Sequence, residues 1–171
     1  MTQRIPYPNM ETVSPDVKYL VESFPLNVFR MAANAPASLK GFMELAKSIL
    51  FYSEFDPRKR EIAILRVAHV TGAVYEWTHH VTLAKNYNVS DHEIQIICTE
   101  NPVKSLDEEG NLLCRVADEI SRNVRLSDDA LAQILQRYAT RGATELILCV
   151  SYFNFLSRFL ESTRVELENG H

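Results

Sequence analysis

The residues of this sequence best suited to chemistry lie close together, between Glu61 and His80. Glu76, His79 and His80 are spaced i, i+3 and i+4, which places all three on one side of a helix. A carboxylate beside an imidazole commonly orients a general acid/base near neutral pH. Glu61 belongs to the preceding, almost wholly apolar stretch, and a buried carboxylate must be paired or protonated, so we expect His80 or His79 to be its partner. The pattern predicts general acid/base catalysis by Glu61, Glu76 and His80.

Each of these residues also has a structural interpretation, which the sequence leaves open. Glu76 could be only the N3 member of a helix cap, and Glu61 could be half of a buried ion pair. His79 points about 100° away from His80 around the helix, and it either lines a substrate pocket or packs at its edge. His69, on the apolar stretch, is expected to be a hydrogen-bonded core histidine.

Three further side chains are candidates for a substrate pocket. Arg66 could hold a substrate carboxylate, or it could neutralise Glu61 or Glu76. Tyr75 and Trp77 flank Glu76 and could line the pocket or pack in the core. The sequence alone leaves both assignments open.

A metal centre is the obvious rival to acid/base chemistry. Glu76-x-x-His79 matches the E-x-x-H half-site of carboxylate di-iron bundles, which need two such motifs and two more Glu. The other E-x-x-H runs from Glu168 to His171, at the end of the sequence. There is also no G-x-S-x-G elbow for a Ser/His/Asp triad. We therefore expect neither a metal ion nor a cofactor.

Composition narrows the class of protein. The 171 residues suit a single domain, and 46% hydrophobic with 23% charged residues is ordinary for a globule. A net charge of −4 argues against nucleic acid as a partner, because phosphate binding needs an excess of Lys and Arg. The basic run Arg58-Lys59-Arg60 is expected to be a solvated first helical turn. The expected partner is a small-molecule substrate.

Compartment is predicted from the cysteines and the apolar runs. Cys98, Cys114 and Cys149 are far apart and each has an apolar helical context, so buried free thiols in a reducing, cytoplasmic compartment are expected. The opening MTQRIPYPNM has no apolar core of a signal peptide. The longest apolar run, near 146–160, is shorter than the roughly 20 residues of a membrane span. We therefore expect no membrane association.

Helix start and stop signals in the sequence predict the helices that carry the candidate residues. Asp56-Pro57 predicts a helix start and Gly72 its end, while Ser90 and Glu93 form a capping box. No segment alternates apolar and polar residues with period two. Helices are expected over 15–25, 26–34, 36–50, 57–71, 75–87, 91–98, 108–123, 128–138 and 143–167. The fold class is all-α, with eight or nine helices in one domain, 1–171, whose core covers about 20–167 behind an extended strap, 1–14.

The stretch EIAILRVAHVTGAVYEWTHHVTLAKNYNVSDHEI resembles the signature of the carboxymuconolactone decarboxylase family, which includes the AhpD-type alkylhydroperoxidases. The likeness extends to RIPYP, NVFRMAANAPASLKGFMEL and ELILCVSYFNFLSR. In the AhpD branch, C-x-x-C-x-x-x-H opens the second helix, with a Glu twelve residues before the first Cys. On this chain that Glu falls on Glu61, the His on His80, and the cysteines on Ala73 and Glu76. Because both thiols are missing, AhpD-type peroxidase activity is predicted to be absent.

The decarboxylase branch resembles this chain more closely, with a Glu matching Glu76 and a His matching His80. The resemblance implies cofactor-independent decarboxylation, or a related proton transfer, on a small carboxylated unsaturated substrate. It also implies a homo-oligomer (dimer, trimer or hexamer), with Phe153, Phe155 and Phe159 as interface candidates. The alternative is a non-catalytic or stress-related oligomer that kept the AhpD fold and lost its thiols.

Overall fold

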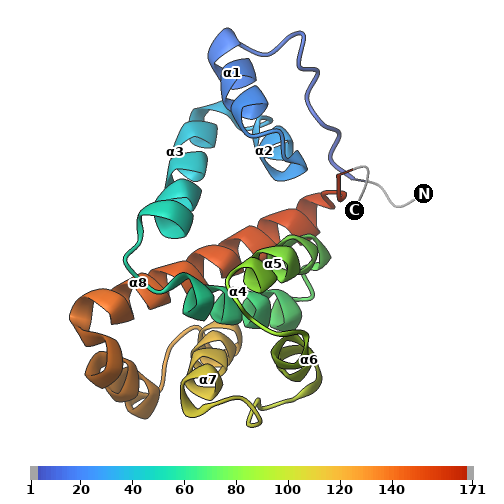
Figure 1. Cartoon of the computed structure of the whole chain (residues 1–171). Coiled ribbons are helices and arrows are strands. Elements are labelled where there is room, and N and C mark those ends of the chain that lie inside the picture. The colour runs from blue at the N-terminus through green and yellow to red at the C-terminus, as the bar shows by residue number, and fades with distance from the viewer. Residues whose placement is uncertain (1–3, 169–171) are drawn as a thin grey trace.

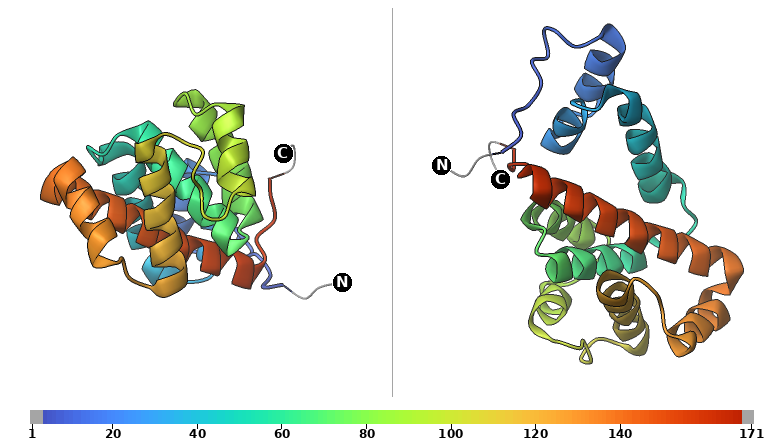
Figure 2. Two further views of the ribbon diagram at one scale, coloured as in Figure 1. Left: turned by 90° about the horizontal axis from the view of Figure 1, so that it is seen from below. Right: turned by 180° about the vertical axis from the view of Figure 1, so that it is seen from behind.

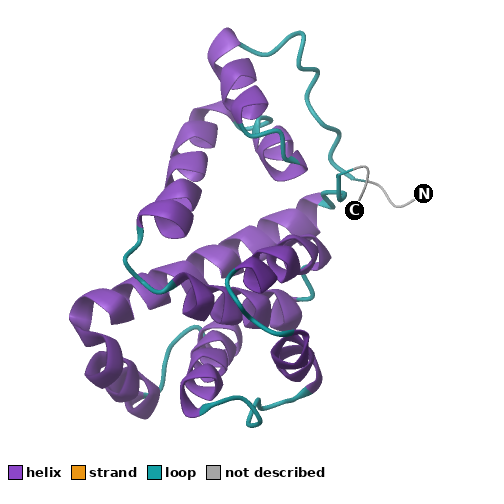
Figure 3. Cartoon of the chain, in the orientation of Figure 1, coloured by secondary structure: helices purple, strands orange, loops and turns teal. Residues whose placement is uncertain are grey.

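The computed structural model describes residues 4–168, and this part of the chain contains helices and loops but no β-strand (Figure 3). The α-helices are α1 (Pro15–Ser23), α2 (Asn27–Ala32), α3 (Pro36–Lys47), α4 (Pro57–Thr71), α5 (Val74–Asn86), α6 (Asp91–Thr99), α7 (Glu108–Asn123) and α8 (Asp128–Thr163). A single π-helical turn, η1 (Ser48–Tyr52), follows α3 within the described residues. The all-α fold predicted from the sequence is confirmed.

Short-range signals determine where the central helices begin and end. The Asp56 carboxylate accepts a hydrogen bond from the backbone N–H of Lys59 at 3.0 Å and caps α4. Gly72 ends α4 in the left-handed region, with φ 71°, where a side chain would be strained. Ser90 and Glu93 form both arms of the capping box at the start of α6. These ends agree with the sequence and fix α4 relative to α5.

Helix α4 is the central helix of the group that α4 to α8 form (Figure 1). It contacts α5, α6, α7 and α8. Ala63, Ile64, Leu65 and Val67 have no exposed surface. A helix that is apolar on every face must be covered on every face, so its polar residues are buried as well.

The helices lie on two sides of α8 (Figures 1 and 2). Helices α1 to α3 form one group with a small apolar cluster of their own, and α4 to α7 form the other. Phe29, Phe42 and Phe159 contact both clusters and join the two groups. A cavity, described below, lies between residues of these two groups and α8.

The last helix differs from the prediction. We expected a new helix to begin after Gly142 and to end at Leu167, but the break lies at Ala139, with φ 54° and ψ −176°, and α8 ends at Thr163. Gly142 lies inside α8, where a Cβ atom would come within 2.8 Å of the Tyr138 Cβ. The glycine therefore permits close packing and does not start the helix. No helix among residues 4–168 has the length and apolar character needed to cross a membrane.

Candidate active site

His80 lies between two carboxylates. Its Nδ1 is 2.6 Å from Oε2 of Glu61, and its Nε2 is 3.4 Å from Oε2 of Glu76. Glu61 comes from α4, whereas Glu76 and His80 lie one turn apart on α5. All three side chains are buried. The structure thus brings together the three residues that the sequence proposed as catalytic, and it pairs Glu61 with His80 rather than His79.

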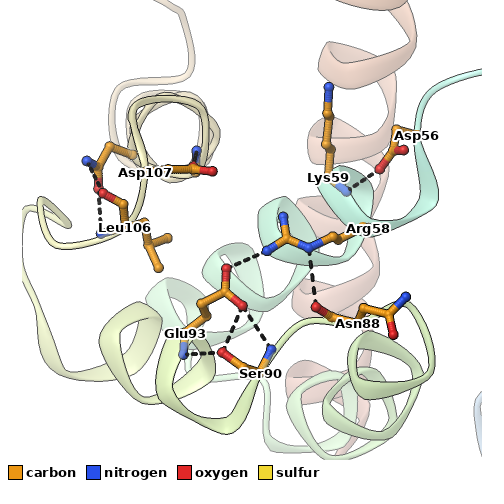
Figure 4. Close-up of polar contacts among 10 residues, drawn as sticks. Asp56, Arg58, Lys59, Asn88, Ser90, Glu93, Leu106 and Asp107 are labelled. Atoms are coloured by element: carbon orange, nitrogen blue, oxygen red, sulfur yellow. Dashed lines mark hydrogen bonds and ion pairs between the residues drawn. The ribbon is translucent and has the colours of Figure 1, made fainter.

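A fourth charged residue, which sequence analysis missed, completes this cluster. Arg60 is 3% exposed, and its Nε and Nη2 atoms lie 3.4 Å from Oε1 of Glu61. The expected solvated run is therefore wrong for Arg60, although Arg58 remains partly exposed and pairs with Glu93 at 2.5 Å (Figure 4). The available signal was helical spacing, since Arg60 lies one turn before Ile64 on a buried face.

These four side chains form a buried cluster without net charge when His80 is protonated and both carboxylates are ionised. Burial alone would lower the pKa of His80, but the charge of Glu61 and the hydrogen bonds to Glu61 and Glu76 outweigh it and raise the pKa to about 9. The imidazole therefore carries a proton at neutral pH. It is ready to act as a general acid whose orientation Glu61 fixes.

A cavity of about 320 Å³ opens onto this cluster between α2, the α3–η1 segment, α5 and α8. That volume suits a small organic molecule. Its polar lining residues are Tyr75, Glu76, His79, His80, Thr82 and Tyr152. The rest of the lining is apolar, from Leu26, Val28, Phe29, Ala46, Leu50, Leu83, Phe153 and Leu156. No Lys or Arg is among these residues.

A second polar group lies at the same cavity, around Glu168. The Tyr75 hydroxyl donates to Oε1 of Glu168 at 2.6 Å, His79 Nε2 lies 2.8 Å from Oε2, and the backbone N–H of Asn27 donates to Oε1 at 2.6 Å. Burial and the bond to Glu168 raise the pKa of Tyr75, so its hydroxyl remains a donor. Sequence analysis missed Glu168 as a site residue. Its partners are far away in the chain, and no local pattern links them.

The possible di-iron half-site does not form. Glu76 faces His80, whereas His79 faces Glu168, so the two side chains of the E-x-x-H motif diverge. The second motif ends at His171, which lies outside the described residues. Among residues 4–168, no group of three or more His, Cys, Asp or Glu side chains is arranged to hold a metal ion.

Arg66 does not belong to the site. It is fully buried, and its Nε and Nη2 atoms bind the Asp118 carboxylate at 2.7 and 2.9 Å. Its Nη1 donates to the carbonyls of Ile97 and Glu100 at 2.7 and 2.9 Å. Both expectations for Arg66 are therefore wrong, because it contacts neither the cavity nor Glu61 or Glu76. Its role is to tie α4 to α6 and α7.

Trp77 and His69 also lie elsewhere. Trp77 is half-buried and its ring centroid lies 6.2 Å from that of His69, in a T-shaped contact. Both line a separate surface hollow beside Cys98. Trp77 does not line the cavity; it packs against the main apolar core, which is the alternative that the sequence left open. His69 is exposed rather than a core histidine. Partial burial and the charge of Arg66 lower the pKa of His69.

The cysteines are not placed for thiol chemistry of the AhpD type. The matching positions are Ala73 and Glu76. Cys114 and Cys149 are buried as expected, and burial raises the pKa of the Cys114 thiol to about 12 and also raises that of Cys149. Cys98 is only half-buried, contrary to expectation, because it borders the hollow beside Trp77. A thiolate nucleophile therefore does not face the cavity.

Phe153 is not an interface candidate in this structure. It is 1% exposed, and its ring stands edge-on to His80 at 4.9 Å, so it forms part of the cavity wall. Phe159 is half-buried against the apolar clusters, and Phe155 is 53% exposed. Of the three phenylalanines, only Phe155 is largely available on the surface.

Comparison with known proteins finds one family model that matches part of the chain. Residues 36–101, which span α3 to α6 and include Glu61, Glu76 and His80, match the model of the carboxymuconolactone decarboxylase family. No curated protein sequence matches the chain significantly.

Solved structures support the fold. An AhpD-core, uncharacterised peroxidase-related protein from Ralstonia eutropha JMP134 is 11% identical and superposes with a TM-score of 0.80, covering 97% of this chain and 92% of that one. An uncharacterised peroxidase-related protein from Silicibacter sp. TM1040 is 14% identical, with a TM-score of 0.75 and coverage of 96% and 88%. A protein of unknown function from Agrobacterium tumefaciens, suggested to be the antioxidant defence protein AhpD, is 18% identical, with a TM-score of 0.67 and coverage of 80% and 94%. At these identities the likeness shows the fold alone.

Proposed function

We propose that this chain, whose residues 36–101 match the model of the carboxymuconolactone decarboxylase family, is a cofactor-independent general acid/base enzyme. The proposed substrate is a small, unsaturated carboxylated compound, and the proposed reaction is decarboxylation. The observation that carries the proposal is the buried imidazole of His80, which Glu61 orients at the wall of a cavity of about 320 Å³.

The reaction is a proton transfer coupled to loss of CO₂. The bond from the substrate carbon to its carboxylate breaks, and its electron pair is delocalised into a conjugated carbonyl, which gives a dienolate. Nδ1 of His80 is bound to Glu61, so Nε2, beside Glu76, is the nitrogen that supplies the proton to carbon. Such general acid catalysis contributes roughly 10²–10⁴-fold, or about 3–5 kcal/mol. The ring then regains its proton from water.

The walls of the cavity favour the loss of a charged group as neutral CO₂. Their lining is mainly apolar, and no Lys or Arg lies among the lining residues. A substrate carboxylate is therefore poorly solvated there and depends on the protonated imidazole for stabilisation, whereas CO₂ does not. The same residues would also serve isomerisation or lactone opening, which need only proton transfer.

The second candidate is a non-catalytic AhpD-fold protein. The observation in its favour is that both nitrogens of His80 already face carboxylates, as they would in a purely structural ion cluster. Under that proposal the cavity binds no substrate that reacts. In either case we propose that the chain assembles as a homo-oligomer.

The test is CO₂ release from a panel of carboxylated muconolactones, β-keto acids and aromatic acids. Wild type, His80→Asn and His69→Asn are compared, because His69 is an exposed imidazole outside the cavity. Substrate-dependent CO₂ that is lost only in His80→Asn supports the enzyme. Equal release from both variants contradicts it, and so does dithiol-dependent consumption of hydrogen peroxide in parallel wells without CO₂ release.

A further inference from the structure

The hydroxyl of Tyr152 has no protein partner. Tyr152 lies on α8, lines the cavity and is 4% exposed, yet its hydroxyl makes no hydrogen bond with any described residue. Buried polar groups are nearly always paired, and an unpaired one costs free energy. By contrast, the hydroxyl of Tyr75 donates to Glu168, and that of Tyr138 donates to Glu109. An unpaired buried hydroxyl on a residue that lines a cavity is a candidate for hydrogen bonding to a bound ligand.

The Tyr152 ring packs in an aromatic cluster that also contacts the proposed acid. The ring is perpendicular to that of Phe153, with 5.4 Å between the two ring centroids. The centroids of the Phe42 and Phe155 rings lie 6.2 and 6.1 Å from its own. Phe153 in turn stands edge-on to His80 at 4.9 Å. Burial and the charge of Glu76 raise the pKa of Tyr152, so the hydroxyl keeps its proton at neutral pH. It can therefore act only as a neutral donor or acceptor.

We propose that the Tyr152 hydroxyl binds the substrate oxygen on which negative charge develops. This inference rests on the proposed function and deepens it. The substrate then carries a carbonyl conjugated to the carbon that loses CO₂, and Tyr152 donates a hydrogen bond to the dienolate oxygen while His80 protonates carbon. A donor already in place at a developing oxyanion contributes about 10²–10³-fold to the rate.

Tyr152→Phe is the direct test, with Tyr138→Phe as the matched control. Tyr152→Phe should reduce kcat by about 10²–10³-fold, while the melting temperature stays equal or rises because an unpaired buried hydroxyl is removed. Tyr138→Phe removes a paired hydroxyl on a residue outside the cavity lining, so it should lower the melting temperature and leave kcat unchanged. A merely structural Tyr152 would show no loss of kcat. That result, with His80→Asn inactive, would overturn the inference and leave the proposed function intact.

A binding measurement separates the inference from the proposed function. The probe is 4-nitrophenolate, whose oxygen mimics an enolate and whose visible absorption reports the hydrogen bonds that it accepts. Tyr152→Phe should bind it about 10–100-fold more weakly than wild type, the range for a hydrogen bond to a charged group, whereas Tyr138→Phe should bind it equally. If no substrate turns over but this difference holds, the function fails and the Tyr152 site stands. Equal affinity of Tyr152→Phe, or no binding by wild type, overturns the inference.

Discussion

At the scale of single residues, His80 makes stability depend on pH. Its pKa is about 9 in the folded chain, against an ordinary value of 6.5, because Glu61 and Glu76 stabilise the charged ring despite its burial. A pKa raised by folding adds stability that is complete below about pH 6.5 and is lost as the pH rises through about 9. The free energy of unfolding should fall by roughly 3 kcal/mol across this range, as measured by urea denaturation at several pH values.

Two histidine variants serve as controls for that measurement. His80→Gln should remove most of the pH dependence, whereas His92→Gln, at an exposed position, should retain it. In the enzyme, kcat should decline above about pH 9, since the general acid is then deprotonated. A stability that does not change between about pH 6 and pH 10 in wild type would contradict a protonated His80.

Arg58 and Arg60 offer a matched pair of substitutions in one basic run. Arg60→Met removes the cation beside fully buried Glu61 and leaves an uncompensated charge, so unfolding should become easier by roughly 3 kcal/mol. Arg58→Met breaks a partly exposed pair with Glu93 and should cost less than about 1 kcal/mol. Thermal and urea denaturation measure both. Similar losses for the two variants would mean that Arg60 is not part of the buried cluster.

At the scale of elements, Glu168 ties the C-terminal segment, 165–168, to Tyr75 and His79, two residues that line the cavity. Glu168→Gln weakens the acceptor shared by Tyr75 and His79, so kcat/KM should fall several-fold and stability should drop by about 1.5–3 kcal/mol. Glu166→Gln, two residues earlier, affects an exposed pair with Arg4 and should change stability by less than about 1 kcal/mol. Steady-state kinetics and denaturation of both variants test this role. Loss of activity in Glu166→Gln alone would contradict it.

The elements were largely predictable from the sequence because their ends carry local signals. Asp56-Pro57, Gly72 and the capping box at Ser90 each act within a few residues, and all three were located correctly. The break in α8 was misplaced because Gly142 looks like a helix boundary, although its small size serves the packing of Tyr138. The sequence alone does not show whether a glycine ends a helix or allows close packing.

The site was only partly predictable, for a related reason. Periodicity shows which side of a helix a residue occupies, so a partner for Glu61 on the next helix could be expected. Periodicity does not show which other helix packs against that side. Arg66 meets Asp118, 52 positions away, and Tyr75 meets Glu168, 93 positions away. Such pairs follow from tertiary packing alone.

At the scale of the whole molecule, one face of α8 is available for assembly. Leu148 and Phe155 are seven residues apart, on the same side of the helix, and are 46% and 53% exposed. Leu148→Asp should weaken the proposed self-association by more than about 10-fold, because it places a charge in an apolar interface. We choose Leu148 for substitution because Phe155 contacts the ring of Tyr152, so that a change at Phe155 would also disturb the cavity wall. Light scattering over a dilution series measures the effect.

Val124→Asp is the control for this substitution. Val124 is 88% exposed at the end of α7, so a charge there should leave the mass unchanged. If Leu148→Asp and Val124→Asp have the same mass as wild type at every concentration, this face of α8 is not the interface. If both dissociate equally, the effect is one of net charge and not of the surface.

The displaced position of Trp77 gives this protein a built-in optical reporter. Trp77 is the only tryptophan in the sequence, and it lies on α5 beside His69, outside the cavity that His79 and His80 line on the same helix. Its fluorescence therefore responds to movement of α5 and to protonation of His69, but not to direct contact with a ligand in the cavity. A ligand whose binding changes the Trp77 emission has moved α5, whereas a ligand that binds without changing the emission fits a cavity that is already formed.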